Sequence, residues 1–405
     1  MNRLFFFPKK PRFWIWFILI TISLCIIFSL FSTSILLAFA QESSEQQGAD
    51  KLNQIIIEQL GKLDLEALQA YVDSLGNFTN ESVVERLIAY ISGTDINYES
   101  MGRQFMTILF AKVWEIVPVF ACIAAITLLS GFVSTMQSNS NTQTTSNMSF
   151  FITYAATLIP LLAVLIECFQ TSIDCVNSMQ KQMQIIFPLM LTLMAASGGS
   201  LSASVCRPAV AFFATNIVSI IRSVVFPITI TIIVFSMIGN FAKDFKMNKF
   251  TAFFKSINKW VIGICVSAFG LFFTLQGITA ANYDGVVRRA AKYAIGNGIP
   301  IVGGFLSGGF DLAVAGSVLI KNSLGSMSIF LLLTVLFEPL ILLLSVHLLL
   351  RLTSALTQPF GDGRISDFLG ETAENLNYCT AGLLFTAFLY FISIMLMVYV
   401  SEVLF

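Results

Sequence analysis

The residues of this chain that could do chemistry are the few ionisable groups that stand inside strongly apolar runs. The clearest is Glu338, near the middle of the run 327–350, and it is followed by Pro339, whose missing N–H frees a backbone carbonyl. An ionisable side chain at membrane depth is costly, so it indicates a functional site unless it is neutral or paired with a basic group on another helix as a structural tie. His347 follows nine residues later, on the opposite face of a helix, so no proton relay is predicted along this segment.

A glycine-rich stretch precedes this run, from Gly296 to Gly325, and holds eight glycines and one proline. Glycine and proline both weaken a helix, and irregular backbone at membrane depth survives only inside protein or beside a wet cavity. We therefore expect close-packed or re-entrant backbone here, with Gly303, Gly304 and Gly308 as its central glycines. The spacing Gly304-x-x-x-Gly308 favours close approach of two helices.

Two charges flank the apolar part of this stretch, Asp311 and Lys321, ten residues apart. They would suit the two ends of a short helix, because an acid near the amino end and a base near the carboxyl end both favour the helix dipole. The functional alternative is a polar lining to a path between helices.

Signatures of catalysis, metal binding and cofactor binding are missing from the sequence. We find no GxSxG, HExxH or Walker A motif, and the glycines at 296, 298 and 303 do not fit GxGxxG. The seven cysteines form no CxxC pair, and a single histidine excludes a multi-histidine metal site. The sequence predicts no enzyme and no cofactor.

The composition is that of a membrane protein. Of 405 residues, 56% are apolar and only 11% are charged, against about 25% charged in soluble domains. A net charge of zero argues against nucleic acid as a partner. The predicted fold class is all-α: a polytopic membrane helix bundle with broken or re-entrant helices and a small extracytoplasmic helical segment.

Three regions follow from the charge pattern. Residues 1–40 have a basic start, an apolar core and an A-x-A end, which favours a signal peptide, although the long core leaves an uncleaved anchor as the alternative. Residues 41–110 carry eleven acidic and four basic side chains, which favours translocation, and their apolar positions recur at helical spacing. Residues 111–405 form the multi-span membrane domain.

The number of spans is predicted as six to eight. The apolar runs are 113–133, 150–169, 185–205, 208–221, 224–241, 260–280, 327–350 and 378–400. We expect Pro188 and the sequence Ser197-Gly198-Gly199-Ser200 to interrupt the third run, and Arg222 to divide the fourth from the fifth.

A basic loop fixes the orientation. It contains five lysines and one acid, so the positive-inside rule predicts a cytoplasmic loop, in agreement with five crossings from an outside residue 41. The lysines are Lys243, Lys246, Lys249, Lys255 and Lys259. Aromatic residues oppose them, so the loop is either a basic amphipathic segment on anionic headgroups or a simple turn. The same count places 281–326 outside unless it re-enters the membrane, although its start is basic.

Two segments resemble a known family. The stretch IPIVGGFLSGGFDLAVAGSVLIKNSLG and the elbow LTSALTQPFGDGRISDFLGETAENL, whose amphipathic second half suggests a helix on the membrane surface or against a partner, are similar to the signatures of the stage III sporulation protein AE family. The resemblance covers most of the chain and is strongest from about 281 to 400.

This resemblance implies a role in the mother cell during sporulation. The chain would be the permease-like component of a secretion or channel complex in the outer forespore membrane, required for late forespore development. Ring-forming subunits and an ATPase would be its partners, with membrane lipid around it. The family offers no catalytic residues to transfer. The alternative function is a stand-alone, ion-coupled secondary transporter of a small solute, suggested by broken helices and Glu338-Pro339.

Overall fold

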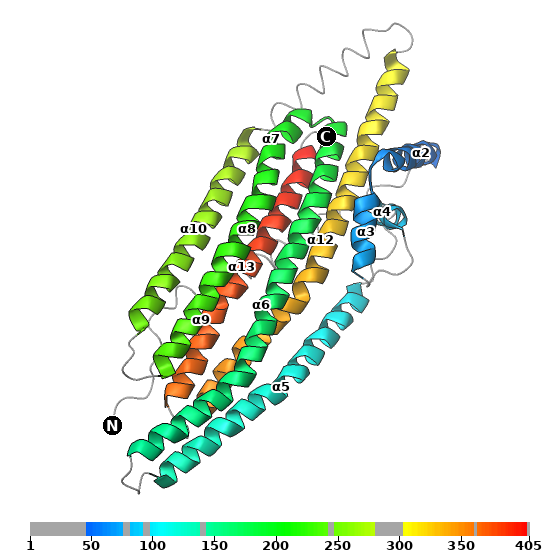
Figure 1. Ribbon diagram of the computed structural model, residues 1–405. Helices are drawn as coiled ribbons and strands as arrows, with labels where there is room; N and C mark the ends of the chain where they lie inside the picture. The colour runs from blue at the N-terminus through cyan, green and yellow to red at the C-terminus, as the bar shows by residue number, and fades with distance from the viewer. Residues whose placement is uncertain are drawn as a thin grey trace, which may run out of the picture. The chain divides into compact units, whose positions relative to one another are not determined.

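The computed structural model describes residues 46–75, 82–91, 98–137, 143–241, 247–279, 303–359 and 363–402, all of them helical apart from short turns. Figure 1 shows the helices coloured along the chain. Residues Leu52–Phe405 form one unit, which contains all the described helices except the first residues of α2. The described residues contain six helices that are long and apolar enough to cross a membrane. The prediction of an all-α, multi-pass membrane protein is therefore confirmed.

Three short helices come first in the unit: α2 (Gln46–Lys62), α3 (Glu66–Ser74) and α4 (Val83–Ile91). The expected capping box starts α4, because the Ser82 hydroxyl accepts from the Glu85 N–H at 3.2 Å and the Glu85 carboxylate accepts from the Ser82 N–H at 3.0 Å. The apolar faces of these helices are buried, with Ile56, Leu68 and Leu87 at 3% exposure or less.

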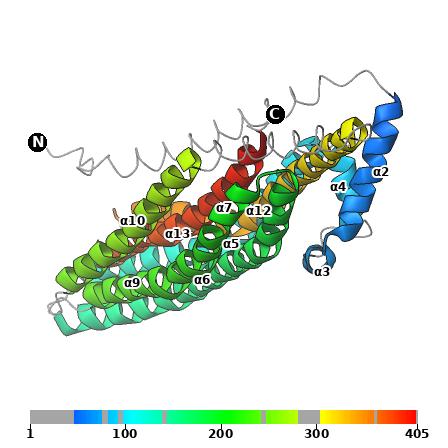
Figure 2. The ribbon, with the colours of Figure 1, turned by 90° about the horizontal axis from the view of Figure 1, so that it is seen from above.

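The long helices follow. They are α5 (Tyr98–Gln137), α6 (Gln143–Ala196), α7 (Ser200–Phe212), the π-helical turn η1 (Phe213–Ile217), α8 (Val218–Ile220), the second π-helical turn η2 (Ile221–Val225), α9 (Phe226–Phe241), α10 (Asn248–Thr279), α12 (Gly303–Thr357) and α13 (Gly363–Glu402). In both ribbon views α12 and α13 lie side by side, and α12 also packs against α6 and α5, while α13 packs against α9 (Figures 1 and 2).

Several predicted interruptions are absent. The run 150–169 and the first part of the run 185–205 join in α6, which continues through the exposed Pro188. The runs 208–221 and 224–241 likewise form one helical path from α7 to α9, in which Arg222 lies in the π-helical turn η2. The break at Ser197–Ser200 is confirmed, and Gly198 there has a φ of 94°, which favours glycine.

The crossing count changes accordingly. Among the described residues, three long helical paths, not five, precede the basic loop: α5, α6 and the path α7–α9. Three is also odd, so a cytoplasmic basic loop stays compatible with an outside residue 41.

Polar side chains join α9 to its neighbours along one stripe. Thr229 accepts from Asn258 of α10 at 2.9 Å, and Ser236 accepts from Asn375 of α13 at 3.1 Å. Asn240 donates to Glu371 of α13 at 3.1 Å. Hydrogen bonds between helices stabilise packing in lipid, where apolar surface alone gives no preference for protein over acyl chains. The amphipathic stretch after the elbow is not a separate surface helix, because it begins α13 and buries Ile365, Phe368 and Leu369 inside the bundle.

Candidate functional site

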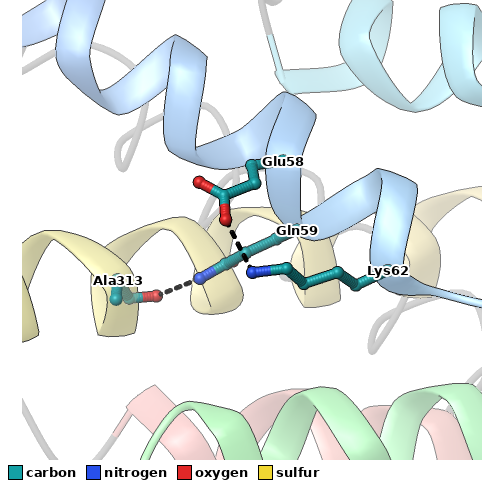
Figure 3. Close-up of polar contacts among 4 residues, drawn as sticks. All are labelled: Glu58, Gln59, Lys62 and Ala313. Carbon is teal, nitrogen blue, oxygen red and sulfur yellow. Dashed lines mark hydrogen bonds and ion pairs between the residues drawn. The ribbon is translucent and has the colours of Figure 1, made fainter.

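The glycine-rich helix α12 holds the acidic segment through one glutamine of α2. Gln59 donates from its amide nitrogen to the Ala313 carbonyl at 2.9 Å (Figure 3). Its amide oxygen accepts from the Ser317 hydroxyl at 3.2 Å, so both ends of the amide are used. The neighbouring Glu58 and Lys62 form an ion pair at 2.6 Å on the exposed side of α2, and Lys62 lowers the pKa of Glu58 by this hydrogen bond and by its charge. Gln59 therefore makes the contact between α2 and α12, which we call the clasp, and the ion pair beside it is exposed.

Gly316 makes room for this clasp. A Cβ at this position would lie 3.3 Å from the Gln59 Oε1 atom and 3.4 Å from the Ile55 Cγ2 atom. Ser317, beside it, is 1% exposed. The small residues of the predicted glycine-rich stretch thus serve close packing at this point, with a polar side chain wedged between the two helices.

Replacing Gln59 with alanine is expected to loosen α2 from α12. The variant loses two hydrogen bonds that are partly shielded from water, which corresponds to about 1–2 kcal/mol of docking free energy. Faster proteolysis or faster amide exchange of residues 52–62 would report the change. Gln54→Ala is the control, because Gln54 is an exposed glutamine of the same helix. Equal behaviour of the two variants would contradict the clasp.

A second glutamine connects α3 to the centre of the bundle. Gln182 of α6 is fully buried, and its amide nitrogen donates to the Tyr71 hydroxyl at 3.0 Å and to the Leu331 carbonyl of α12 at 3.2 Å. Burial raises the pKa of the Tyr71 phenol, and the hydrogen bond from Gln182 acts in the opposite direction. Three helices that are far apart in the sequence, α3, α6 and α12, therefore meet at one amide.

Lys321 does not end a short helix as predicted. It lies inside the 55-residue helix α12, is fully buried, and donates to the Val398 carbonyl near the carboxyl end of α13 at 2.7 Å. Carbonyls in the last turn of a helix carry partial negative charge, which favours a cation. The favourable dipole interaction expected for Lys321 exists, but with a different helix. Asp311 lies in the same helix and is half-buried.

Glu338 belongs to a charged cluster. The Lys112 ammonium of α5 lies 3.6 Å from Glu338, 3.3 Å from Glu115 and 4.0 Å from Glu167 of α6. The Glu338 side chain is 57% exposed, and Pro339 follows it inside continuous helix. Glu338 is thus paired with a basic group on another helix, which is one of the alternatives to a functional site that the sequence leaves open.

Replacing Lys112 with glutamine is expected to lower stability by less than about 1 kcal/mol, because the three carboxylates are exposed and water screens their repulsion. The double variant Lys112→Gln/Glu338→Gln should recover part of the loss, since one of the repelling charges is then gone. Thermal unfolding in detergent at low and high salt would measure both effects. A loss that Glu338→Gln leaves unchanged would show that the charges are not coupled.

The other predicted site residues fall in two groups. Gly303, Gly304 and Gly308 lie in the first turns of α12, which is regular helix from Gly303 onward and not irregular backbone, while 280–302 lie outside the described residues. Lys249, Lys255 and Lys259 lie on α10, whereas Lys243 and Lys246 are outside the described residues. His347 contacts the Ala373 carbonyl through Nδ1 at 2.8 Å. Within the described ranges no group of histidine, cysteine, aspartate or glutamate is placed to hold a metal ion.

Sequence reasoning missed Gln59, Gln182 and Lys112. The signal for Lys112 and Gln182 was available, because each is a polar residue next to or inside an apolar run. Their partners on other helices are 55 to 258 residues away in the sequence, and a single sequence gives no indication of such pairs.

Comparison with known proteins gives a match to one protein family. Residues 82–401 match the family described as Stage III sporulation protein AE. The chain is 23% identical over 349 residues to "Stage III sporulation protein AE" of Bacillus subtilis (strain 168), over 83% of this chain and 87% of that protein. No solved structure matches. The matched residues run from the start of α4 through α13 and make up most of the chain, so this chain belongs to the stage III sporulation protein AE family.

Proposed function

We propose that this protein is the permease-like membrane component of a secretion or channel complex that links mother cell and forespore. Membership of the sporulation family is the observation that carries the proposal. The six long apolar helices supply a body that can sit in the membrane, and the acidic helices α2–α4 supply a surface for partners on the extracytoplasmic side.

The docking of α2 and α3 on the bundle supports this role. A segment that only tethered the chain would need no clasp, whereas Gln59 and Tyr71 join these helices to α12 and α6 by side-chain hydrogen bonds. A partner that binds α2–α4 would therefore bind a surface that is fixed to the membrane helices. We propose that ring-forming subunits contact the protein there, and that a separate ATPase subunit supplies energy from the cytoplasm. The membrane would be the mother-cell membrane around the forespore.

Deleting the gene is expected to block spore formation after engulfment while vegetative growth stays normal. Counts of heat-resistant spores and microscopy of forespores would measure this, with the wild-type gene at a second locus as the control. A growth defect together with normal sporulation would contradict the proposal. Ion-coupled uptake of a solute by the purified protein in liposomes would instead favour the stand-alone transporter.

A further inference from the structure

The long helices are tied together at two levels. The charged level is the cluster of Lys112, Glu115, Glu167 and Glu338, which joins α5, α6 and α12. The aromatic level joins α6, α9 and α13: Tyr154 lies 5.4 Å from Phe241 and 5.5 Å from Phe368 between ring centroids, and its hydroxyl donates to the Met237 carbonyl at 2.7 Å. Tyr154 and Glu167 are both on α6, so the two levels are about 20 Å apart along this helix.

Between these levels, and just beyond them, α5, α6 and α12 expose many large apolar side chains, while Arg351 of α12 and Glu374 of α13 are exposed charged residues nearer the aromatic level. Trp114 on α5 is 79% exposed, Ile159 on α6 is 72% exposed and Leu348 on α12 is 67% exposed. The set within and just beyond the two levels is Phe110, Trp114, Leu129, Met148, Phe151, Ile152, Ile159, Ile166, Leu344, Leu348, Leu352 and Leu356, and Met106 of α5, further beyond the charged level, is also exposed. On α5 the band runs from Phe110 to Leu129, 20 residues or about 30 Å, the thickness of a bilayer's hydrocarbon core.

Beyond the charged level, on the side away from Tyr154, polar and charged side chains are exposed. On α6 they include Gln170, Asp174, Lys181 and Gln184. On the path from α7 to η2 they include Arg207, Thr215, Asn216 and Arg222, and the Arg222 guanidinium donates to Asn177 of α6 at 2.7 Å. On α12 no described residue from 311 to 337 is exposed. Charged side chains facing lipid are costly, so this part of the surface suits water.

The lengths of α6 and α12 also require that part of each helix lies outside the lipid. Helix α6 has 54 residues, about 80 Å, and α12 has 55, whereas a bilayer core is about 30 Å thick. Hydropathy alone accepts Phe150–Ala196 and Asp311–Thr357 as candidate spans, so it does not tell which part of each lies in lipid. Helix α10 exposes apolar side chains from Phe250 to Leu271 and does not mark an edge by itself.

The two ends of the bundle differ in charge: the basic loop lies at one end and the acidic segment at the other. Phe241 ends α9 at the aromatic level, and the basic loop and Lys249 follow it directly, which makes this the cytoplasmic end. Gln59 of the acidic segment docks at Ala313, which is 25 residues, or about 38 Å of helix, beyond Glu338 on the other side.

We propose that lipid acyl chains surround the bundle only from the cytoplasmic end to the charged level, and that the helices beyond this level stand in water on the extracytoplasmic side. The part in water comprises α6 after about residue 170, α7 to η2, α12 before Glu338 and the carboxyl-terminal part of α13 around Val398, which Lys321 contacts, together with α2–α4. The charged cluster then lies at the headgroup boundary, where Trp114 also belongs. The lipid-facing surface is defined by the exposed apolar band, independently of the proposed function.

Two single-tryptophan variants test this placement. The four tryptophans (Trp14, Trp16, Trp114 and Trp260) are replaced by phenylalanine, and one tryptophan is then introduced at Leu348 or at Phe212. Both positions carry a large, exposed apolar side chain, 67% and 53% exposed, but Leu348 lies in the band and Phe212 lies beyond the charged level. The proteins are reconstituted in phosphatidylcholine vesicles with brominated acyl chains, and iodide serves as the aqueous quencher.

The two variants are expected to be sensitive to opposite quenchers. Leu348→Trp should lose most of its emission to brominated lipid and little to iodide, and Phe212→Trp should show the reverse. Ile159→Trp provides a second position in the band if Leu348→Trp does not fold, as judged by circular dichroism. Strong quenching of Phe212→Trp by brominated lipid, or strong quenching of either band position by iodide, would overturn the proposal.

Discussion

Replacing Gly325 with alanine is expected to destabilise the folded protein by about 1–3 kcal/mol, as overpacking of a tight core does. A Cβ built on Gly325 would lie 2.6 Å from the Val398 Cγ2 atom, closer than real carbon atoms approach. Ile394 and Met190 surround the same point at 3.7 Å, so α13 and α6 both lie against this glycine of α12. Relief requires Val398 to move, and the Val398 carbonyl is the acceptor of the buried Lys321. A leucine at this position should cost more than the alanine.

Gly263→Ala is the matched control. Gly263 is also a glycine in the middle of a long helix, α10, but a Cβ there meets no atom within 4 Å. Alanine favours a helix over glycine by about 1 kcal/mol, so this variant should be equally or more stable. Thermal unfolding in detergent, followed by circular dichroism, compares the two. A Gly325→Ala variant as stable as Gly263→Ala would show that α12 and α13 are less tightly packed at this level.

Much of the fold could be predicted from the sequence, because apolar runs and helix stops are local properties. The break at Ser197–Ser200 shows this: two adjacent glycines end a helix by their own backbone freedom. The sequence also predicts interruptions at Pro188 and Arg222, but both residues lie within continuous helical paths. Both side chains are exposed, and the Arg222 guanidinium donates to Asn177. This exposure depends on neighbouring helices that the local sequence does not reveal.

The glycine-rich stretch illustrates the same limit. Its glycines predicted irregular backbone, yet from Gly303 it is continuous helix, because glycine at a helix contact lets the neighbouring helix approach and the packing offsets its lower helix propensity. Gly316 and Gly325 face α2 and α13 respectively, and both contacts depend on residues far away in the chain. Gly316 and Gly325 make contacts of the kind that the GxxxG motif predicts, and the contact of Gly304 and Gly308 themselves stays a prediction.

The two glutamines and the glycines act on one helix from different sides. Gln59 holds α2 at Ala313 and Ser317, while Gln182 holds α3 at Leu331, more than one helical turn further along α12. The acidic segment is therefore fixed to the membrane helices at two separate points.

The second large effect is expected at Gln182, where replacement by glutamate should destabilise the protein by several kilocalories per mole. The two side chains have the same shape, but glutamate has no amide nitrogen to donate to the Leu331 carbonyl or to the Tyr71 hydroxyl. An ionised carboxylate at a fully buried position would also lack a cation, which corresponds to about 3–5 kcal/mol in buried ion pairs that lose one partner.

Gln184→Glu is the control for charge alone, because Gln184 lies two residues away on the same helix and is exposed. Gln182→Leu separates charge from hydrogen bonding: it removes both hydrogen bonds but adds no charge, and it also removes the Gln182 Oε1 atom, which is buried without a hydrogen-bond partner. The leucine variant should therefore lose much less stability than the glutamate variant. Thermal unfolding in detergent ranks the three proteins, and proteolysis of residues 52–75 reports whether α3 separates first. If Gln182→Glu is as stable as Gln184→Glu, the amide is not the buried link between the acidic segment and the bundle.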